Sequence, residues 1–422
     1  MSGPPSRRTR ARRLFVDLGP LHRDRDFRWI WSGQAINGIG TQITRIALPY
    51  QVYVMTGSTL AIAALTLVQL VPILIFALGA GTVADAVDRR KLLLATQFGL
   101  LCCSAALVGL SLLPAPPLAA LFAVAFVAAG IASIDQPARS SSVARLVPPE
   151  RLPAAIALNQ LNFQSASVIG PAVGGALIAT VGLSGAYLVD ALSFAASLIA
   201  IWAIAPLPPL GEVARPGLAA IREGLRFVAS RRVILSSFVI DLNAMVFGMP
   251  TSLFPALALD VFKVGPGGLG LLAAAPAAGA FLGALLSGWV STTRRIGVGV
   301  IAAVAVWGLA IALFGLSAFS FPLALVFLAI AGAADVISAV FRSTIVQLET
   351  PDQLRGRVTS IHILVVTSGP RIGDIEAATV ASVVGTQLSV VSGGVLCLIG
   401  VVVVARLFPE LAAHVPRHRE TG

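Results

Sequence analysis

Long apolar runs alternate with short breaks along almost the whole chain. The runs repeat at about 20 to 28 residues, and a helix of that length, at about 1.5 Å rise per residue, crosses a hydrocarbon layer of about 30 Å. A membrane-spanning strand needs only about half as many residues, and the breaks are rich in Gly, Pro and Arg, which favours helices joined by tight loops. The twelve predicted spans are residues 28–54, 59–84, 92–113, 117–146, 153–181, 184–204, 233–259, 266–290, 296–316, 321–346, 356–384 and 387–407. The pattern therefore predicts an all-α membrane protein with twelve transmembrane helices.

The composition and the charges agree with this prediction. Of the 422 residues, 57% are hydrophobic and 12% are charged, whereas a soluble domain has roughly 25% charged residues. Of the 30 Lys and Arg residues, 27 lie on one side of the spans, in the two terminal segments, in the breaks on that side or in the span ends that border them. By the positive-inside rule that side is the cytoplasm, so both termini are expected there.

The net charge of +11 is therefore explained by topology, and no nucleic acid partner is expected. The basic segment "SRRTRARR" (Ser6 to Arg13) is expected to rest on anionic lipid. It leads into a span of full length, so the first span is expected to act as the insertion signal, without a cleavable signal peptide.

A polar interruption divides the spans into six and six. Within residues 206–232, Ile221, Leu225 and Phe227 mix with arginines at helical spacing, which predicts an amphipathic helix on the cytoplasmic face. The expected organisation is a basic tail at 1–27, a six-helix bundle at 28–205, this linker at 206–232, a second six-helix bundle at 233–407 and a C-terminal tail at 408–422.

The two halves resemble each other most at the ends of the fourth and tenth spans. "ARSSSVARLVPPERL" (Ala138 to Leu152) corresponds to "FRSTIVQLETPDQL" (Phe341 to Leu354), because each has an Arg-Ser pair, an apolar stretch and a Pro-acid-x-Leu turn before the next helix. Duplication of six spans with a cytoplasmic connector is typical of secondary transporters, in which two halves rock about a site near the membrane midplane. The repeat therefore favours alternating access over a channel.

Several kinds of chemistry lack the residues that they need. The three cysteines, at positions 102, 103 and 397, lie within spans, and the four histidines, at positions 22, 362, 414 and 418, have no Cys pair at zinc-finger spacing to accompany them. The chain also lacks a G-x-x-x-x-G-K-[ST] motif for ATP hydrolysis. The sequence predicts no metal, no cofactor and no enzymatic activity, so an ion gradient or a partner subunit must drive any work.

One cluster of charges, "GTVADAVDRRK" (81–91), separates the second span from the third. It resembles the loop between helices two and three of the major facilitator superfamily, whose pattern is G-x-x-x-D-R-x-G-R-[RK]-[RK]. The matching positions are Gly81, Asp85, Arg89, Arg90 and Lys91, and Ala86 and Asp88 depart from the pattern. The resemblance implies a fold of two pseudo-symmetric six-helix bundles.

The same loop is predicted to be a conformational latch that closes in the outward-facing state. Asp85 would lie at the N-terminus of the eleventh helix, where the helix dipole favours an anion. Arg89 would reach Asp135 at the cytoplasmic end of the fourth helix. The alternative is a positively charged loop that only determines topology.

A second stretch, "SVIGPAVGGAL" (Ser167 to Leu177), is similar to the G-x-x-x-G-P-x-x-G-G motif associated with antiporters. The matching positions are Gly170, Pro171, Gly174 and Gly175, and Ala166 replaces the leading glycine. Ordinary packing of small residues in a membrane is the alternative. With "ALPYQVYVMTGST" (47–59), "LFPALALDVF" (253–262) and "GALLSGWV" (283–290), the chain resembles a branch of bacterial exporters that moves siderophores, drugs and lipids across the inner membrane.

Polar and ionisable side chains inside spans are unfavourable in lipid, so each is a candidate site. In this superfamily the first, fourth, seventh and tenth helices line the cavity. The substrate-cavity candidates are Gln34, Asn37, Gln42, Arg45, Asn243 and Arg371. For the two arginines the alternative is internal ion pairing, with Asp190 for Arg45 and Asp374 for Arg371.

An antiporter also needs a group whose proton affinity changes as the cavity changes sides, and a carboxyl in a low-dielectric cavity has this property. Asp241 is the first candidate and Asp335 the second, because both lie well inside cavity-lining helices and neither has an Arg within one helical turn in sequence. Asp374 fits less well beside an arginine. Glu376 and Asp190 follow as further candidates.

The sequence therefore predicts a monomeric secondary transporter that exports a small amphipathic molecule, a drug-like compound or a siderophore, in exchange for protons. A facilitator that moves lysophospholipid or another lipid without protons is the first alternative. An intramembrane enzyme or sensor is the second, although the sequence has neither clustered His, Ser or Cys at mid-membrane depth nor a soluble output domain. The expected partners are the substrate, protons and the lipid bilayer.

Overall fold

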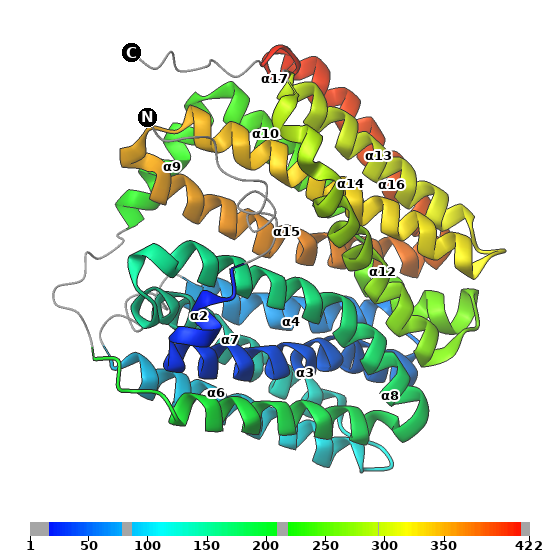
Figure 1. Cartoon of the computed structure of the whole chain (residues 1–422). Coiled ribbons are helices and arrows are strands. Elements are labelled where there is room, and N and C mark those ends of the chain that lie inside the picture. The colour runs from blue at the N-terminus through cyan, green and yellow to red at the C-terminus, as the bar shows by residue number, and fades with distance from the viewer. Residues whose placement is uncertain (1–16, 78–86, 209–217, 294, 415–422) are drawn as a thin grey trace, which may run out of the picture. The chain divides into compact units, whose positions relative to one another are not determined.

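The computed structural model describes residues 17–77, 87–208, 218–293 and 295–414, which form helices joined by short turns (Figure 1). The long helices are α3 (Arg25–Thr56), α4 (Thr59–Ala77), α6 (Arg89–Ser111), α7 (Leu118–Leu146), α8 (Leu152–Trp202), α9 (Leu218–Ser230), α10 (Arg232–Phe247), α12 (Gly265–Leu286), α13 (Ile296–Leu316), α14 (Phe321–Glu349), α15 (Arg355–Val384) and α16 (Thr386–Leu407). The short helices are α2 (Gly19–Arg23), α11 (Phe254–Ala256) and α17 (Pro409–Ala413).

These helices are consistent with the twelve predicted spans. Among the described residues, nine helical stretches are long and apolar enough to cross a membrane. One of them, residues 149–202, contains the predicted fifth and sixth spans, which meet at Gly182, where a φ of 76° interrupts the helix. Glycine adopts this left-handed backbone without a steric penalty. The first and eleventh predicted spans correspond to α3, with 32 residues, and α15, with 30 residues.

The predicted seventh span, residues 233–259, corresponds to the apolar stretch Arg232–Val261, within which the α-helix is interrupted. α10 ends at Phe247, and the chain continues as a 3₁₀ turn at Thr251–Leu253, as α11, and as a π turn at Leu257–Val261. Pro250 lies at the interruption and has no N–H group with which to continue a helix. The span was predicted from its apolar run, and Pro250 was not considered as a possible interruption of the helix.

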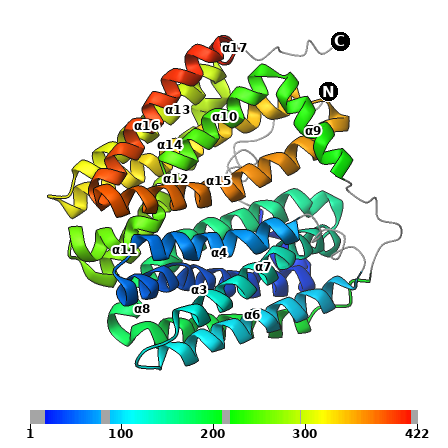
Figure 2. The same ribbon diagram turned by 180° about the vertical axis from the view of Figure 1, so that it is seen from behind.

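The chain divides into two compact units. The first consists of Met1–Thr44, Val71–Gly170 and Ser184–Val213. Within it α6 packs against α7, which Figure 2 shows from behind. Ile30, Leu93, Ala138 and Ile201 form a buried cluster that joins α3, α6, α7 and α8.

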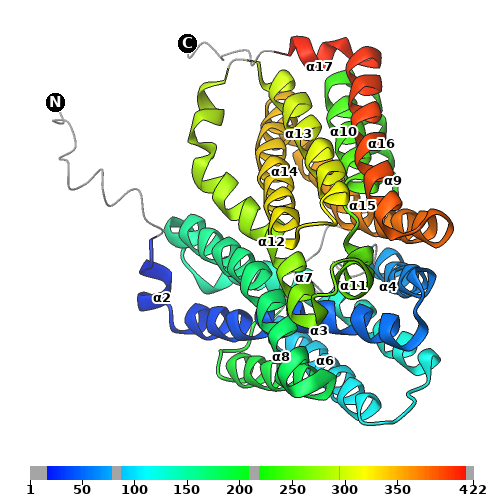
Figure 3. The same cartoon turned by 90° about the vertical axis from the view of Figure 1, so that its right-hand side faces the viewer.

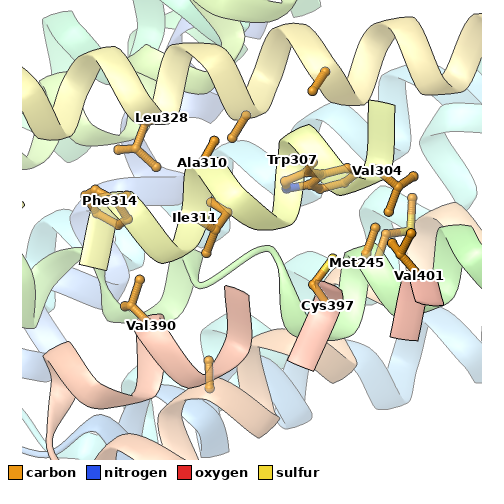
Figure 4. Close-up of a cluster of buried hydrophobic side chains, with 14 of the residues drawn as sticks. Met245, Val304, Trp307, Ala310, Ile311, Phe314, Leu328, Val390, Cys397 and Val401 are labelled. Carbon is orange, nitrogen blue, oxygen red and sulfur yellow. The ribbon is translucent and has the colours of Figure 1, made fainter. Parts of the chain in front are cut away.

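The second unit consists of Arg45–Leu70, Pro171–Leu183 and Ala214–Gly422. In this unit α13 packs against α14 and α16, as Figure 3 shows, and α10 packs against α15. Figure 4 shows Trp307 of α13 near Met245 of α10 and Cys397 of α16. Trp307 is 3% exposed, and its Nε1 donates to the Gly248 carbonyl at 2.8 Å, which satisfies a backbone group at the interrupted seventh span. The predicted boundaries at 205 and 233 stay predictions.

The linker contains the expected helix, α9. It packs on α15 through Gly224, where a Cβ would lie 2.9 Å from Ile361 Cδ1, and through the buried Val228. Arg222 and Arg226 are exposed. The helix therefore has one buried face and one charged face. Leu225, which the sequence placed among its apolar residues, is exposed, and the location of the helix on the cytoplasmic face stays a prediction.

The internal repeat is visible in the local structure. A 3₁₀ turn at Pro149–Arg151 precedes α8, and a 3₁₀ turn at Asp352–Leu354 precedes α15. The two Pro-acid-x-Leu stretches therefore form the same kind of turn at corresponding places in the two halves.

Candidate functional site

The charged loop at 81–91 is described only in part, and Gly81 and Asp85 lie outside the described residues. Asp88 forms the N-cap of α6, because its Oδ1 accepts hydrogen bonds from the backbone N–H groups of Arg90 at 2.9 Å and Lys91 at 3.3 Å. An Asp at this place satisfies donors that the helix leaves open. The motif thus caps helix α6, which begins at Arg89.

The Arg90 side chain has a second structural role. Its guanidinium donates to the backbone carbonyl groups of Ile201 and Trp202 at the C-terminal end of α8, where the helix dipole favours a cation. These contacts lie within the first unit. The latch role of Asp85 and Arg89 stays a prediction.

Asp135 on α7 is buried and has three side-chain donors. Its Oδ1 accepts from Thr96 Oγ1 at 2.6 Å and from Gln97 Nε2 at 3.0 Å, and its Oδ2 accepts from Arg139 Nε at 3.1 Å. Arg139 lies one turn further along α7, a spacing that the sequence already contained. The proposed contact of Asp135 with Arg89 stays a prediction.

The second unit contains one arginine between two acids. Arg342 of α14 is 3% exposed, its Nη1 lies 2.6 Å from Asp241 Oδ1 of α10, and its Nη2 lies 3.8 Å from Asp335 Oδ1 of α14. The Asp241 side chain is 1% exposed and the Asp335 side chain is 36% exposed. The shorter contact is an ion pair without the alignment of a hydrogen bond. A single positive charge therefore faces two carboxyl groups.

The distance of Arg342 from the two acids along the sequence did not predict that it contacts both of them. Arg342 is two helical turns from Asp335 and reaches Asp241 from another helix, so both acids have a cationic neighbour. His362 of α15 was considered isolated, yet its ring lies 5.7 Å from the Phe238 ring and it interacts electrostatically with Arg342. Only the packing of α10 against α15 brings it here, and no local pattern indicated it.

Asp374 of α15 holds the interrupted seventh span. Its Oδ1 accepts from Thr251 Oγ1 at 2.6 Å and from the backbone N–H of Ser252 at 2.7 Å. The Ser252 hydroxyl donates back to the Asp374 carbonyl at 2.8 Å. These bonds satisfy donors at the start of the segment after Pro250, so a structural role explains this acid.

The other charged candidates in the second unit lie near Asp374. Arg371 donates to the Thr367 carbonyl at 2.6 Å and interacts electrostatically with Asp374 and with Arg45 of α3. Arg45 in turn interacts with Asp374. Glu376 is half-buried two residues further along α15. Two cations and one acid therefore interact here, and the roles of Arg45, Arg371 and Glu376 in binding substrate or protons stay predictions.

Three of the predicted cavity residues hold helices together through their side-chain amides. The bonds run from Asn37 Nδ2 to Gln97 Oε1 at 3.3 Å, from Gln42 Nε2 to Ser167 Oγ at 3.0 Å, and from Asn243 Nδ2 to the Cys397 carbonyl at 3.0 Å. Gln34 differs, because its Oε1 is buried without a hydrogen-bond partner. Contact of these residues with substrate stays a prediction.

The glycine motif lies within α8. Its residues are Gly170, Pro171, Gly174 and Gly175. A Cβ on Gly170 would lie 2.4 Å from Gln42 Cβ, in the first unit. A Cβ on Gly175 would lie 2.8 Å from Gly270 Cα, in the second unit. Close helix packing, the structural alternative, explains both glycines, and the antiporter role stays a prediction.

Asp190 of α8 is a buried acid, 1% exposed, whose side-chain donors are hydroxyl groups. Its Oδ2 accepts from Thr44 Oγ1 of α3 at 2.6 Å and from Ser104 Oγ of α6 at 2.7 Å, and its Oδ1 has no hydrogen-bond partner. These donors come from two other helices, so no local pattern identified them. The predicted pairing of Asp190 with Arg45 stays a prediction.

Two further bonds join the end of α3 and the start of α4 to other parts of the second unit. The Tyr53 hydroxyl donates to the Asp260 carboxylate, and Thr59 Oγ1 donates to the Ala378 carbonyl at 3.0 Å. Sequence reasoning missed all four residues, because their partners are more than 200 positions away.

Comparison with known proteins agrees with this architecture. The model of the transmembrane secretion effector family matches residues 16–418. The enterobactin exporter EntS of Citrobacter koseri is 28% identical over 414 residues, and that of Shigella boydii serotype 18 is 27% identical over 415 residues. Each alignment covers 96% of this chain and 96% of the relative.

Solved transporter structures have the same fold. A POT family transporter in complex with 5-aminolevulinic acid matches with a TM-score of 0.73 at 13% identity, over 92% of this chain and 97% of that one. A bacterial homologue of the human lysosomal transporter Spinster, inward-facing and unoccupied, matches with a TM-score of 0.73 at 16% identity, over 92% and 98%. The chain therefore belongs to the transmembrane secretion effector family of the major facilitator superfamily, and it is a multi-pass membrane transporter similar to enterobactin exporters.

Proposed function

We propose that this transporter exports a small amphipathic molecule, a siderophore or a drug-like compound, in exchange for protons and by alternating access. Full-length similarity to enterobactin exporters supports export and a siderophore-like substrate. The strong excess of Lys and Arg on one side supports a cytoplasmic location of both termini in a bacterial inner membrane. The protein is proposed to act as a monomer.

The observation that carries proton coupling is the group of Arg342, Asp241 and Asp335. A guanidinium charge can balance one carboxylate, and a second carboxylate in the same low-dielectric region is unfavourable unless it takes up a proton. The group therefore holds either one proton and one balanced ion pair, or no proton and an excess negative charge. This is the property that an antiporter needs.

The geometry favours Asp335 over Asp241 as the group that exchanges the proton. Asp335 is 36% exposed and lies 3.8 Å from Arg342, whereas Asp241 is nearly fully buried at 2.6 Å from it. When Asp335 is protonated, the guanidinium of Arg342 is attracted only to the carboxylate of Asp241. When Asp335 loses its proton, Arg342 is attracted to both carboxylates. Because Asp241 is on α10 and Asp335 is on α14, proton exchange changes how strongly the two helices are held together.

Transport by purified protein in lipid vesicles tests the coupling, with enterobactin as the probe. We expect the wild-type protein to accumulate the probe only under an imposed pH gradient. Asp335→Asn should still bind the probe but lose accumulation driven by the gradient. Glu410→Gln is the matched control, because this partly exposed acid pairs with Arg232 at 3.2 Å at the first residue of α10, and it should transport as the wild type does.

Two outcomes would contradict the coupling scheme. Undiminished accumulation by the Asp241→Asn, Asp335→Asn double variant would remove both acids from the mechanism and leave Asp374, Glu376 or Asp190 as the carrier. Equal transport with and without a gradient would favour the uncoupled facilitator of lysophospholipid or another lipid.

We also propose that the loop at 81–91 latches the cytoplasmic side. Asp85→Asn and Arg89→Ala should insert normally but transport more slowly, because each removes a contact that stabilises one state. The double variant Arg89→Asp, Asp135→Arg should recover activity relative to either single change. Wild-type transport by both single variants would reduce the loop to a topology signal.

A further inference from the structure

We propose that Asp190 is a proton-binding site of its own, located in the first unit and separate from the acids around Arg342. Its Oδ1 is the atom that carries the proton. The contacts of Asp190 alone support the binding of a proton there. The role of this site in export rests on the proposed function.

The two carboxyl oxygens of Asp190 have different surroundings. Oδ2 accepts from the hydroxyls of Thr44 and Ser104, while Oδ1 is buried without any donor. Ser193 Oγ lies beside the carboxyl, where its hydrogen can turn to an ionised carboxylate, and in the structure this hydrogen is donated to the Asp190 backbone carbonyl at 2.7 Å. A proton on Oδ1 can therefore be donated to a lone pair of Ser193 Oγ, which gives both oxygens of the neutral acid a suitable partner.

Among the described residues, the side chains that the Asp190 carboxyl is seen to contact carry no positive charge. Thr44 faces it from α3, Ser104 from α6, and Tyr187 and Ser193 from α8 itself, and Tyr187 is the titratable one among these. Arg45 follows Thr44 on α3, and it interacts electrostatically with Asp374 and Arg371. An ionised carboxylate that is buried without a cation is strongly disfavoured, so the neutral acid fits this place.

The backbone of α3 makes room for the acid. A Cβ on Gly40 would lie 2.9 Å from Asp190 Oδ1 and 2.1 Å from Ser193 Oγ. Glycine at this position therefore lets Oδ1 and the Ser193 hydroxyl lie directly against the helix. The close approach also shields Oδ1 from other polar groups of α3.

A series of buried side chains connects Asp190 with Asp135. The Ser193 hydroxyl can donate to Asn37 Oδ1 at 3.4 Å in place of the Asp190 carbonyl, Asn37 Nδ2 donates to Gln97 Oε1 at 3.3 Å, and Gln97 Nε2 donates to Asp135 Oδ1 at 3.0 Å. Amides transmit polarisation along such a series but do not release protons readily. Ionisation of Asp190 thus changes the strength of the bonds that join α3, α6 and α7, without a proton passing along them.

The donors also favour a proton over a metal cation. Thr44 and Ser104 direct their hydrogens at Oδ2, and Ser193 directs its hydrogen at a backbone carbonyl. A hard cation such as sodium needs several oxygen lone pairs that point at it. In the observed arrangement the hydroxyl groups act as donors.

Labelling with dicyclohexylcarbodiimide, which modifies protonated carboxyls in apolar surroundings, tests the site in the full-length protein in lipid vesicles. We expect mass spectrometry to find the modification on the peptide that contains Asp190 at neutral pH, and to find less of it as the pH is raised. Asp190→Asn should lose this label, and Asp335→Asn should keep it. The wild-type titration is informative even if a variant folds poorly.

A positioning test uses the hydroxyl donors. Ser104→Ala removes one of the hydroxyl groups that stabilise the ionised carboxylate, so the labelling should persist to a higher pH. Ser111→Ala is the control on the same helix, because its hydroxyl donates only to the Val108 carbonyl of its own turn. An unchanged labelling profile in Ser104→Ala would contradict the assigned contacts.

Two results would overturn the inference. One is an Asp190 that stays unlabelled at every pH in a wild-type protein that still transports, which leaves the proposed coupling intact. The other is a label that sodium suppresses at constant pH, which would assign the site to a cation. Conversely, a labelled Asp190 in a protein whose transport ignores the pH gradient would overturn the proposed function and leave this site standing.

Discussion

Two almost fully buried aspartates, one in each unit, are held in opposite ways. Asp241 lies 2.6 Å from the guanidinium of Arg342, whereas Asp190 is held by the hydroxyls of Thr44 and Ser104. A buried ion pair depends on both charges, while an acid held by hydroxyls is compatible with a neutral state. The depth of an intramembrane acid therefore does not determine its role, because the groups on neighbouring helices do.

The largest expected effect comes from breaking the ion pair. Arg342→Gln leaves Asp241 buried without its cation, and we expect a loss of about 3–5 kcal/mol in the free energy of unfolding. A lower midpoint of thermal unfolding in detergent measures it. The double variant Asp241→Asn, Arg342→Gln should recover a large part of the loss, because it removes both charges. An unchanged midpoint in Arg342→Gln would show that Asp241 is already neutral, and the contrast with Asp190 would disappear.

The next effect sharpens the account of Asp190. Gly40→Ala places a Cβ 2.1 Å from Ser193 Oγ and 2.9 Å from Asp190 Oδ1. We expect this crowding to destabilise the protein by about 1–3 kcal/mol. Gly109→Ala on α6 is the control, because nothing lies within 4 Å of its added Cβ. Equal thermal midpoints for the two variants would mean that Gly40 is not in close contact with the acid.

Replacing each acid by asparagine should change the stability of the protein less at Asp190 than at Asp241. Asp190→Asn keeps an oxygen for Thr44 and Ser104, so the free energy of unfolding should change by less than about 1 kcal/mol. Asp241→Asn removes the negative charge that pairs with Arg342, so its free energy of unfolding should fall by about 3 kcal/mol. The two thermal midpoints measure this difference. An Asp190→Asn variant as unstable as Asp241→Asn would indicate that Asp190 is ionised and paired.

The smallest effect is expected at an exposed ion pair, which gives the scale for the buried ones. Arg232 lies 3.2 Å from Glu410, and their side chains are 60% and 39% exposed. Arg232→Ala should cost about 0.5 kcal/mol, because water screens both charges. A loss comparable to that of Arg342→Gln would mean that burial does not make the ion pair of Arg342 contribute more to stability than the exposed pair.

Much of the fold was predictable because lipid imposes a length and a polarity on each span. The ninth predicted span corresponds to α13, which begins at Ile296 and ends at Leu316 as predicted, since charged or polar residues border an uninterrupted apolar run. The seventh span was predicted less well. Pro250 interrupts its helix, and Thr251 and Ser252 donate hydrogen bonds to Asp374 just after the interruption. Asp374 is more than 120 positions away in the sequence, so no local pattern predicted these bonds.

The candidate site was predictable as a set of residues but not as a set of contacts. Asp241 and Asp335 were recognised because acids inside spans are rare. Arg342 as their shared partner, and the hydroxyls around Asp190, come from other helices and leave no local signal. The i to i+4 pair of Asp135 and Arg139 was visible in the sequence and was overlooked.

The exchange of protons for substrate is the central claim, and proton movement measured together with substrate movement tests it most directly. Wild-type protein in vesicles that contain a pH-sensitive dye should move protons in the direction opposite to enterobactin when only an enterobactin gradient is applied. Asp335→Asn should lose this proton movement, and Glu410→Gln should keep it. Enterobactin transport by the wild-type protein without any movement of protons would contradict the account.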